Sequence, residues 1–141
     1  MLQVEDNAGY EKLIHEAFVQ SQEQLQIDVV QSGEQAISYL KQKRDTSEAQ
    51  LPDLILLDLN VPDINGHEVL RYIRADEQLK HIPVIIFSTS DSEKDILQSY
   101  QLGANAYVIK PLDLRELIQF ISLLVDFWLK TARLPSEPWQ H

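Results

Sequence analysis

The sequence predicts an α/β protein with a doubly wound parallel sheet, and three observations support this fold class. Short apolar runs alternate with segments whose apolar residues recur every three or four positions, as strands alternate with helices. The runs are continuous, which is typical of strands buried on both faces of a parallel sheet. Polar residues follow directly after these runs, and turn-forming residues lie in the connections.

The first three strand–helix pairs follow from this pattern in chain order. The expected strands cover 1–4, 27–30 and 54–57. Ser32, with Gln35 three residues later, has the spacing of a capping box and predicts the start of the second helix. The turn before the third helix contains Pro62, Asn65 and Gly66. The apolar residues that define these helices are Tyr10, Leu13, Ile14, Ala17 and Phe18; Ala36, Ile37 and Leu40; and Val69, Leu70 and Ile73.

The second half continues the alternation, with strands expected over 84–87 and 106–109. Two serine–acid pairs have capping-box spacing before the fourth helix: Ser90 with Glu93, and Ser92 with Asp95. That helix carries Ile96, Leu97 and Tyr100 and is expected to end at Gly103. Pro111 ends the fifth strand and is expected to start a long last helix.

Five strands therefore alternate with five helices, and the sequence shows no internal repeat. Because crossovers between parallel strands are right-handed, few topologies remain. We expect a flavodoxin-like (βα)5 arrangement with strand order 2-1-3-4-5 and an extended last helix. In sheets of this kind, ligands bind at the carboxyl ends of the strands.

Composition narrows the function. The chain has 141 residues, no cysteine and a net charge of −10. A disulfide scaffold and a cysteine-ligated metal are excluded, and no apolar run approaches the ~20 residues that span a bilayer. We therefore expect a soluble, cytoplasmic protein with no membrane partner. An acidic surface repels nucleic acid, and the GxGxxG and P-loop motifs are missing.

Polar side chains converge at one edge of the expected sheet. They follow the first, third, fourth and fifth strands: Glu5 and Asp6, Asp58, Ser88, and Lys110. Crowded carboxylates repel one another, and a divalent cation relieves that repulsion. Oxygen ligands with open positions suit Mg²⁺. The four histidines, His15, His67, His81 and His141, are too dispersed for a metal site and are expected at the surface.

A lysine ammonium and a serine hydroxyl beside such a metal suit a phosphoryl group, and an aspartate carboxylate can be its nucleophile. Each residue alone has an ordinary explanation, such as a helix cap or a surface lysine. The joint arrangement is hard to obtain by chance. Asp58 is therefore predicted to be a phosphoacceptor.

Four motifs give the chain a resemblance to the receiver domain of bacterial response regulators: VEDN, PDLILLDLNVPDING, PVIIFSTSD and GANAYVIKP. The resemblance runs from Met1 to about Val125. It implies a single-domain response regulator with a receiver domain over 1–126 and a C-terminal helix extension and tail over 127–141. Asp58 would accept phosphate from a phosphohistidine on a sensor histidine kinase. Apart from self-phosphorylation and autodephosphorylation, the protein is not expected to be an enzyme.

The same resemblance implies a metal site and a phosphoryl clamp. Asp6 and Asp58 would bind Mg²⁺ directly, together with the backbone carbonyl of Asn60. Glu5 would assist through water. Lys110 would pair with the phosphoryl oxygens, beside a Lys110–Pro111 bond that is typically cis in this family.

The resemblance also implies a switch. Ser88 would move toward the phosphoryl group and Tyr107 would turn inward behind it. This change would bias the face built from the fourth helix, the fifth strand and the fifth helix. Thr89 and Ser90, with Asn60, lie where the family tunes autodephosphorylation.

The last helix is apolar around much of its circumference. One stripe is expected to cover the sheet: Leu114, Leu117, Ile118, Ile121, Leu124, Val125 and Trp128. Phe120, Leu123 and Phe127 lie beyond it, as part of either a wide core face or a second buried surface.

The segment VDFWLKTARLP, over 125–135, is similar to the C-terminal region of small receivers paired with bacterial phytochrome kinases. Those receivers dimerise through the face built from the fourth helix, the fifth strand and the fifth helix. We therefore expect a homodimer with Phe120, Phe127 and Trp128 at its interface. We also expect a phytochrome-type kinase as partner, and an output made through a protein contact. Trp139, in the tail, could pack against the second copy.

Two other functions share parts of this pattern. A phosphatase of the haloacid type uses a strand-end aspartate and Mg²⁺, but it has a second acid two residues later, where this chain has Asn60. A flavin- or nucleotide-binding module has a phosphate loop after the first strand, where this chain has Glu5, Asp6 and Asn7.

Overall fold

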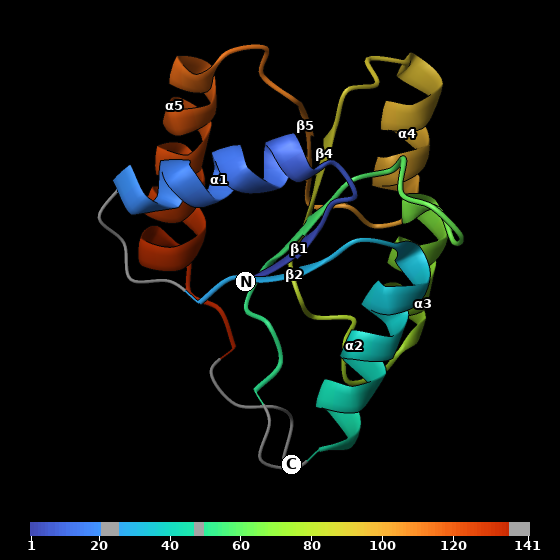
Figure 1. Ribbon diagram of the computed structural model, residues 1–141. Helices are drawn as coiled ribbons and strands as arrows, with labels where there is room; N and C mark the ends of the chain where they lie inside the picture. Colours follow the sequence, from blue (N-terminus) through green and yellow to red (C-terminus); the bar gives the residue numbers. More distant parts are fainter. Residues whose placement is uncertain (21–25, 47–49, 136–141) are drawn as a thin grey trace.

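The computed structural model describes residues 1–20, 26–46 and 50–135. Its centre is a parallel sheet with the order β2-β1-β3-β4-β5, which confirms the predicted topology (Figure 1). The strands are β1 (Leu2–Val4), β2 (Asp28–Val30), β3 (Ile55–Leu57), β4 (Val84–Ser88) and β5 (Ala106–Ile109). The helices are α1 (Ala8–Gln20), α2 (Gly33–Asp45), α3 (Gly66–Ala75), α4 (Glu93–Gln101) and α5 (Leu114–Leu124).

Helices cover both faces of the sheet, because successive strand residues point to opposite sides. On one side Leu2, Ile55 and Leu57 pack against residues of α2 and α3. On the other side Leu54 and Leu56 belong to the cluster formed with α1 and α5. Figure 1 shows these two layers, with α1 and α5 on one side and α2, α3 and α4 on the other. None of the described helices is both long and apolar enough to cross a membrane.

Side-chain caps set the starts of the helices. Ser32 caps α2 by accepting the Gln35 N–H at 3.1 Å, as predicted. Of the two candidate pairs at α4, Ser92 with Asp95 forms the cap.

The expectation that Pro111 starts the last helix is wrong. The helix begins three residues later, at Leu114, and Asp113 is its N-cap. The carboxylate of Asp113 accepts the N–H of Glu116 at 2.8 Å and so satisfies one of the free donors of the first turn. Pro111 lies in the connection between β5 and α5.

Helix α4 is weakly packed. Ser99 is its buried residue, and the apolar side chains Leu97 and Tyr100 are 59% and 49% exposed. The helix still ends where the sequence predicts, because Gly103 adopts φ 101°, a conformation that other residues rarely reach.

The last helix changes its winding. Helix α5 is followed directly by a π-helix, η1 (Val125–Thr131). The core face of α5 and η1 together consists of Leu117, Ile121, Leu124 and Val125. On the outer side, Leu123 is 70% exposed and Phe127 is 53% exposed. Phe120 stacks on Phe87 with ring centroids 5.0 Å apart, so it packs partly against the core. Trp139 lies outside the described residues.

Candidate functional site

The ends of three strands bring the charged residues of the site together. In the parallel register, Val4 of β1 pairs with Leu57 of β3, so the next residues, Glu5 and Asp58, are neighbours at the same edge. Lys110 follows the end of β5, and its N–H donates to the carbonyl of Ser88 at 2.8 Å. The chain after Asp58 can turn closely because of Gly66, where a Cβ would lie 2.6 Å from the carbonyl oxygen of Asp58.

Lys110 bridges the two buried acids. Its Nζ lies 2.8 Å from Oε1 of Glu5 and 2.8 Å from Oδ2 of Asp58, and its side chain is 3% exposed. Burial alone would lower the pKa of Lys110, but the bonds to Asp58 and Glu5 outweigh burial and raise it. The ammonium group therefore stays charged at neutral pH. It also lies 4.4 Å from the centre of the Tyr10 ring, a cation–π distance.

The pKa of Glu5 is the one most raised by this arrangement. Burial raises its pKa from 4.5 to about 7, and the nearby charge of Asp58 acts in the same direction, while Lys110 opposes it. The N–H of Asn7 also donates to Oε2 of Glu5 at 3.2 Å. The edge of the sheet thus holds more negative charge than one lysine neutralises.

Asp58 is oriented by two donors. Lys110 donates to Oδ2, and the N–H of Asn60 donates to Oδ1 at 3.0 Å. The carboxylate is 5% exposed, so it lies just below the surface. Both carboxylate oxygens are therefore fixed in direction.

The residues present fit a divalent cation. Glu5, Asp6 and Asp58 each offer a carboxylate oxygen, and these atoms lie within 4.8 Å of one another. Asp6 is exposed while the other two are buried, which leaves one side of the cluster open to water. Hard oxygen ligands with room for water match the preferences of Mg²⁺ and Mn²⁺.

The two expected switch residues lie on the neighbouring strands β4 and β5. Ser88 is fully buried at the end of β4, and its Oγ accepts the N–H of Ser90 at 3.3 Å. Tyr107 is half-buried against the α2–α3 side of the core, and its hydroxyl donates to the carbonyl of Ser90 at 2.8 Å.

The Lys110–Pro111 bond is trans, as is every peptide bond among the described residues, so the expected cis bond is not found. The trans form is the intrinsically favoured one, by about 0.5–1 kcal/mol before proline. In this arrangement the Pro111 carbonyl accepts the hydroxyl of Tyr10 at 3.3 Å.

Sequence reasoning missed the contribution of Tyr10. It was assigned to the apolar face of the first helix, yet it contacts both the ammonium of Lys110 and the edge of the Phe87 ring. Its position at the start of α1, next to the acid pair, was the available signal.

Comparison with known proteins identifies the family. The response regulator receiver domain matches residues 1–122. The chain belongs to this family. Response regulator Rcp1 of Synechocystis is 35% identical over 136 residues, which cover 96% of this chain and 92% of Rcp1. The probable methanogenesis regulatory protein FilR2 of Methanothrix harundinacea is 36% identical, over 96% of this chain and 87% of FilR2.

Solved receiver structures agree with the fold. The phosphorylated cyanobacterial phytochrome response regulator RcpA superposes with a TM-score of 0.88 at 44% identity, over 96% of both chains. The Mn²⁺-bound form of Rcp1 gives 0.86 at 36% identity, over 96% of this chain and 97% of Rcp1. A receiver domain of the kinase PA1611 from Pseudomonas aeruginosa, 26% identical with a TM-score of 0.70, holds magnesium in its active-site cleft, and covers 91% of this chain and 94% of that one. Receiver domains thus bind divalent metal at the acidic site.

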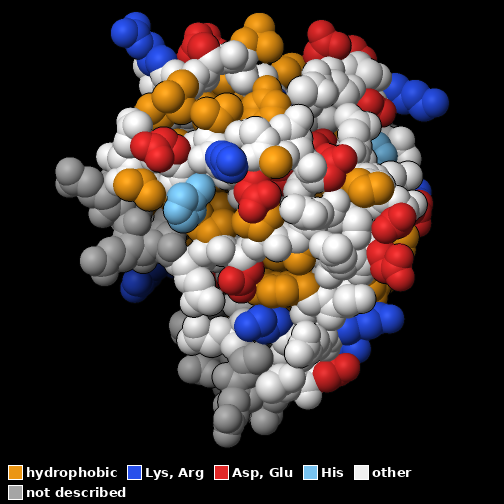
Figure 2. Space-filling view, viewed as in Figure 1, with side chains coloured by type: hydrophobic (Ala, Val, Ile, Leu, Met, Phe, Trp, Pro, Cys, Tyr) orange, Lys and Arg blue, Asp and Glu red, His pale blue; other side chains and the backbone are white. Residues whose placement is uncertain are grey.

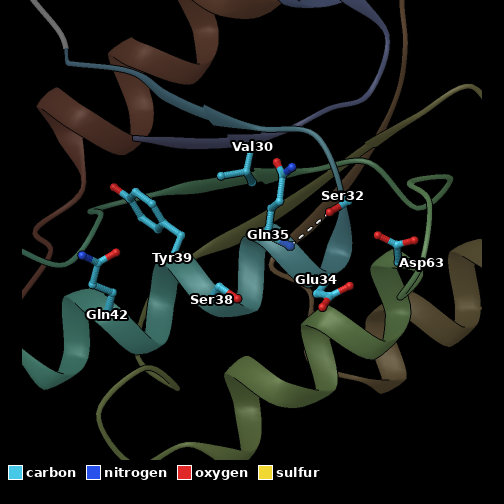
Figure 3. Close-up of a pocket in the computed structure, with 8 residues that line it drawn as sticks. All are labelled: Val30, Ser32, Glu34, Gln35, Ser38, Tyr39, Gln42 and Asp63. Carbon is cyan, nitrogen blue, oxygen red and sulfur yellow. Dashed lines mark hydrogen bonds between the residues drawn. The ribbon is translucent and has the colours of Figure 1, made fainter.

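A separate depression lies beside α2, outside the acidic site. It has a volume of about 480 Å³ and is lined by Val30, Ser32, Glu34, Gln35, Ser38, Tyr39, Gln42 and Asp63. Figure 3 shows that most of these side chains come from successive turns of α2. None of the charged residues around Asp58 lines it.

Proposed function

We propose that this protein is a response regulator of a two-component phosphorelay in which Asp58 accepts a phosphoryl group from a sensor histidine kinase. One observation carries the proposal. Asp58 is held by Lys110 on one oxygen and by the Asn60 N–H on the other, at an edge where Glu5 and Asp6 add uncompensated negative charge.

The step itself is a phosphoryl transfer. An oxygen of Asp58 forms a bond to phosphorus while the P–N bond of the phosphohistidine breaks, and that electron pair leaves with the imidazole. A Mg²⁺ held by Asp6 and Asp58, with the Asn60 carbonyl and with Glu5 assisting through water, would supply charge neutralisation. Lys110 exchanges a carboxylate oxygen for a phosphoryl oxygen, and the Ser88 hydroxyl donates to another. In this proposal the protein is no enzyme beyond its self-phosphorylation and autodephosphorylation.

A phytochrome-type kinase is the proposed partner. The support is the similarity over nearly the full chain to Rcp1 and to RcpA, which is a phytochrome response regulator. A partner of this kind places the protein in the cytoplasm.

Exposed apolar side chains lie in and just after the connection from β5 to α5. Leu112, two residues after Lys110, is 96% exposed, and Leu114 is 39% exposed. Figure 2 shows hydrophobic side chains gathered over the region of α5 and the loop that leads into it. Exposed apolar side chains of this kind mark a docking surface, here for the kinase domain that carries the phosphohistidine.

The docking role predicts that a substitution at Leu112 changes the rate of phosphoryl transfer from a kinase but not from a small acyl phosphate. Leu112→Glu should slow transfer from a purified histidine kinase by about tenfold, because a charge replaces an apolar contact. Transfer from a small acyl phosphate should stay unchanged, since that donor needs no docking. Leu97→Glu, the same substitution at an exposed position of α4, is the matched control. Equal slowing with both donors would assign Leu112 to the chemistry instead.

The test of the phosphoacceptor is the intact mass after incubation with Mg²⁺ and a small acyl phosphate. The expected result is one added phosphoryl group on the parent protein, and none on Asp58→Asn or in EDTA. Binding of Mg²⁺ with beryllofluoride, a phosphoryl mimic, separates a short-lived product from a missing acceptor. An unchanged signal from Asp58→Asn would refute the assignment.

The proposed assembly is a homodimer through the face of α4, β5 and α5, with Phe120, Phe127 and Trp128 at the interface. Phe127 is half-exposed and lies 5.1 Å from Trp128 in an edge-to-face pair. Sedimentation at tens of micromolar, with and without beryllofluoride, should show a dimer that Phe127→Lys dissociates. A parent protein that remains monomeric in both conditions would contradict this assembly.

A further inference from the structure

Ser90, two residues after Ser88, bonds three elements with its three polar groups. Its N–H donates to Oγ of Ser88 on β4 at 3.3 Å, and its carbonyl accepts the hydroxyl of Tyr107 on β5 at 2.8 Å. Its own hydroxyl donates to Oδ2 of Asp95 on α4 at 2.7 Å and accepts the N–H of Ser92 at 3.3 Å. Figure 1 shows the connection from β4 running to the start of α4, where this residue lies.

The bond to Ser88 defines what the Ser88 hydroxyl can do. A hydroxyl oxygen that accepts an N–H bond still has its own hydrogen to donate. The N–H of Ser90 therefore fixes the oxygen of a fully buried side chain and leaves its hydrogen available to an acceptor at the acidic edge. Moving Ser88 moves this bond, and Ser90 with it.

The bond to Asp95 matters because α4 has little apolar burial to hold it. Its buried residue is the serine Ser99, and Leu97 points into solvent. Polar contacts through Asp95 therefore contribute much of what fixes the start of this helix. The hydroxyl–carboxylate bond is charge-assisted, which makes it stronger than a neutral one.

A second contact extends the connection to α3. Ser99 donates its hydroxyl to the carbonyl of Asp95 at 2.7 Å, and Nε2 of His67 lies 2.9 Å from the same hydroxyl oxygen. Since that hydroxyl has one hydrogen, His67 is the donor in this pair. Burial also lowers the pKa of His67, which keeps the ring neutral. His67 is thus half-buried and bonded, in contrast to the surface position expected from the sequence.

We infer that Ser90 is a positioning residue whose hydroxyl couples the orientation of Ser88 to the position of α4. The inference rests on the proposed function of Asp58. With the Ser90–Asp95 bond made, the arrangement seen here is favoured. A phosphoryl group on Asp58 that draws Ser88 toward it also pulls on the Ser90 N–H. This movement of Ser90 weakens the bond between its hydroxyl and Asp95. By linkage, a protein without the bond reaches the phosphoryl-bound arrangement more easily.

The test is the affinity of the full chain for beryllofluoride in the presence of Mg²⁺, measured from amide resonances. Ser90→Ala should bind the mimic about three- to tenfold more tightly, the value of one side-chain hydrogen bond. Ser90→Thr, which keeps a hydroxyl, should bind like the parent. Asp95→Ala should tighten binding to a similar extent, and the double variant should gain nothing more.

Ser92→Ala is the matched control, because it removes the cap on the Asp95 N–H but keeps the backbone N–H that donates to Oγ of Ser90, and it does not touch Ser88 or Tyr107. It should change the affinity less than twofold. Without any mimic, Ser90→Ala should shift the resonances of Tyr107 as well as α4, and Ser92→Ala those of α4 alone. Equal tightening by both variants, or none by Ser90→Ala, overturns the inference. A parent that binds no mimic overturns the proposed function and the inference together.

Discussion

Two cations lie at opposite ends of the sheet, the buried Lys110 and the half-buried Arg74, and their surroundings differ. Lys110, at the carboxyl end, lies between the carboxylates of Glu5 and Asp58. Arg74, in the last turn of α3, lies near the amino ends of β4 and β5 and bonds neutral acceptors. These acceptors are the carbonyls of Gly103, Lys80 and Ile82 and the side-chain oxygen of Asn105, at 2.8–3.0 Å.

The contacts of Lys110 can be exchanged for others, whereas those of Arg74 have no competing partner. A cation between two carboxylates responds to any added charge, because a metal or a phosphoryl group alters the balance around it. A guanidinium among neutral dipoles has no such competitor, although burial lowers its pKa. The sheet therefore joins a rigid end, where Arg74 connects α3 to two loops, with an end whose bonding can be exchanged.

Removal of Lys110 should have the largest effect on the free energy of unfolding. Lys110→Met leaves two buried carboxylates without their cation and should lower the free energy of unfolding by about 3–5 kcal/mol in EDTA. Mg²⁺ should restore a large part of the loss, about 2.7 kcal/mol at a hundredfold excess over its Kd. Urea unfolding with and without Mg²⁺ measures both effects. A loss that Mg²⁺ leaves unchanged would show that the cluster does not hold the metal in the folded state.

Removal of Arg74 should cost slightly less and should not respond to metal. Arg74→Met leaves the part-buried carbonyls of Gly103 and Ile82 without this donor, and we expect a loss of about 2–3 kcal/mol. Arg74→Lys is the matched variant, since it keeps the charge but not the fork of donors, and it should recover only part of the loss. The same urea series checks this. Recovery by Mg²⁺ would contradict the division between a fixed end and an exchangeable end.

The smallest effect concerns the carboxylate of Asp28, on the edge strand β2, and the neutral hydroxyl of Tyr39. The hydroxyl of Tyr39 donates to Asp28 at 2.5 Å, and this bond lowers the pKa of Asp28 below 3.8. A lowered carboxyl pKa contributes stability above the unfolded value, and that stability is lost as the pH falls through the folded value.

Tyr39→Phe should therefore cost about 0.5–1 kcal/mol at pH 7, a reduced value because water screens this contact. The cost should shrink as the pH falls from 7 through the folded pKa of Asp28. Urea unfolding at pH 7 and over a series of acidic pH values, with the Asp28 pKa followed by NMR, tests the sign. A cost that grows toward low pH would be contrary to it.

Much of this fold could be predicted from the sequence, for physical reasons visible at particular residues. The run before Asp58 is apolar without interruption because β3 is the central strand, buried on both faces. Parallel strands share one carboxyl edge, so the positions of Glu5, Asp58 and Lys110 in the sequence were enough to bring them together. The handedness of the crossovers left few strand orders, and the flavodoxin-like order expected among them is the one observed.

Other features depended on contacts that periodicity does not encode. The start of α5 at Leu114 is set by the cap from Asp113, and a proline nearby suggested an earlier start. The junction at Ser90 depends on how one loop folds, and both serine–acid pairs before α4 had suitable spacing. The exposure of Leu97 arises because α4 rests on the sheet over a small area.

The π-helix after α5 absorbs extra chain length without rotating the residues that follow it. Its hydrogen bonds span five residues instead of four, so a turn of η1 holds about one residue more than an α-helical turn. Deleting one residue within Val125–Thr131 and restoring α-helical winding would therefore leave the following residues facing nearly the same way. A deletion within α5 has no such compensation and would rotate everything after it by about 100°. The chain after η1 should thus tolerate a change of length in η1 better than one in α5.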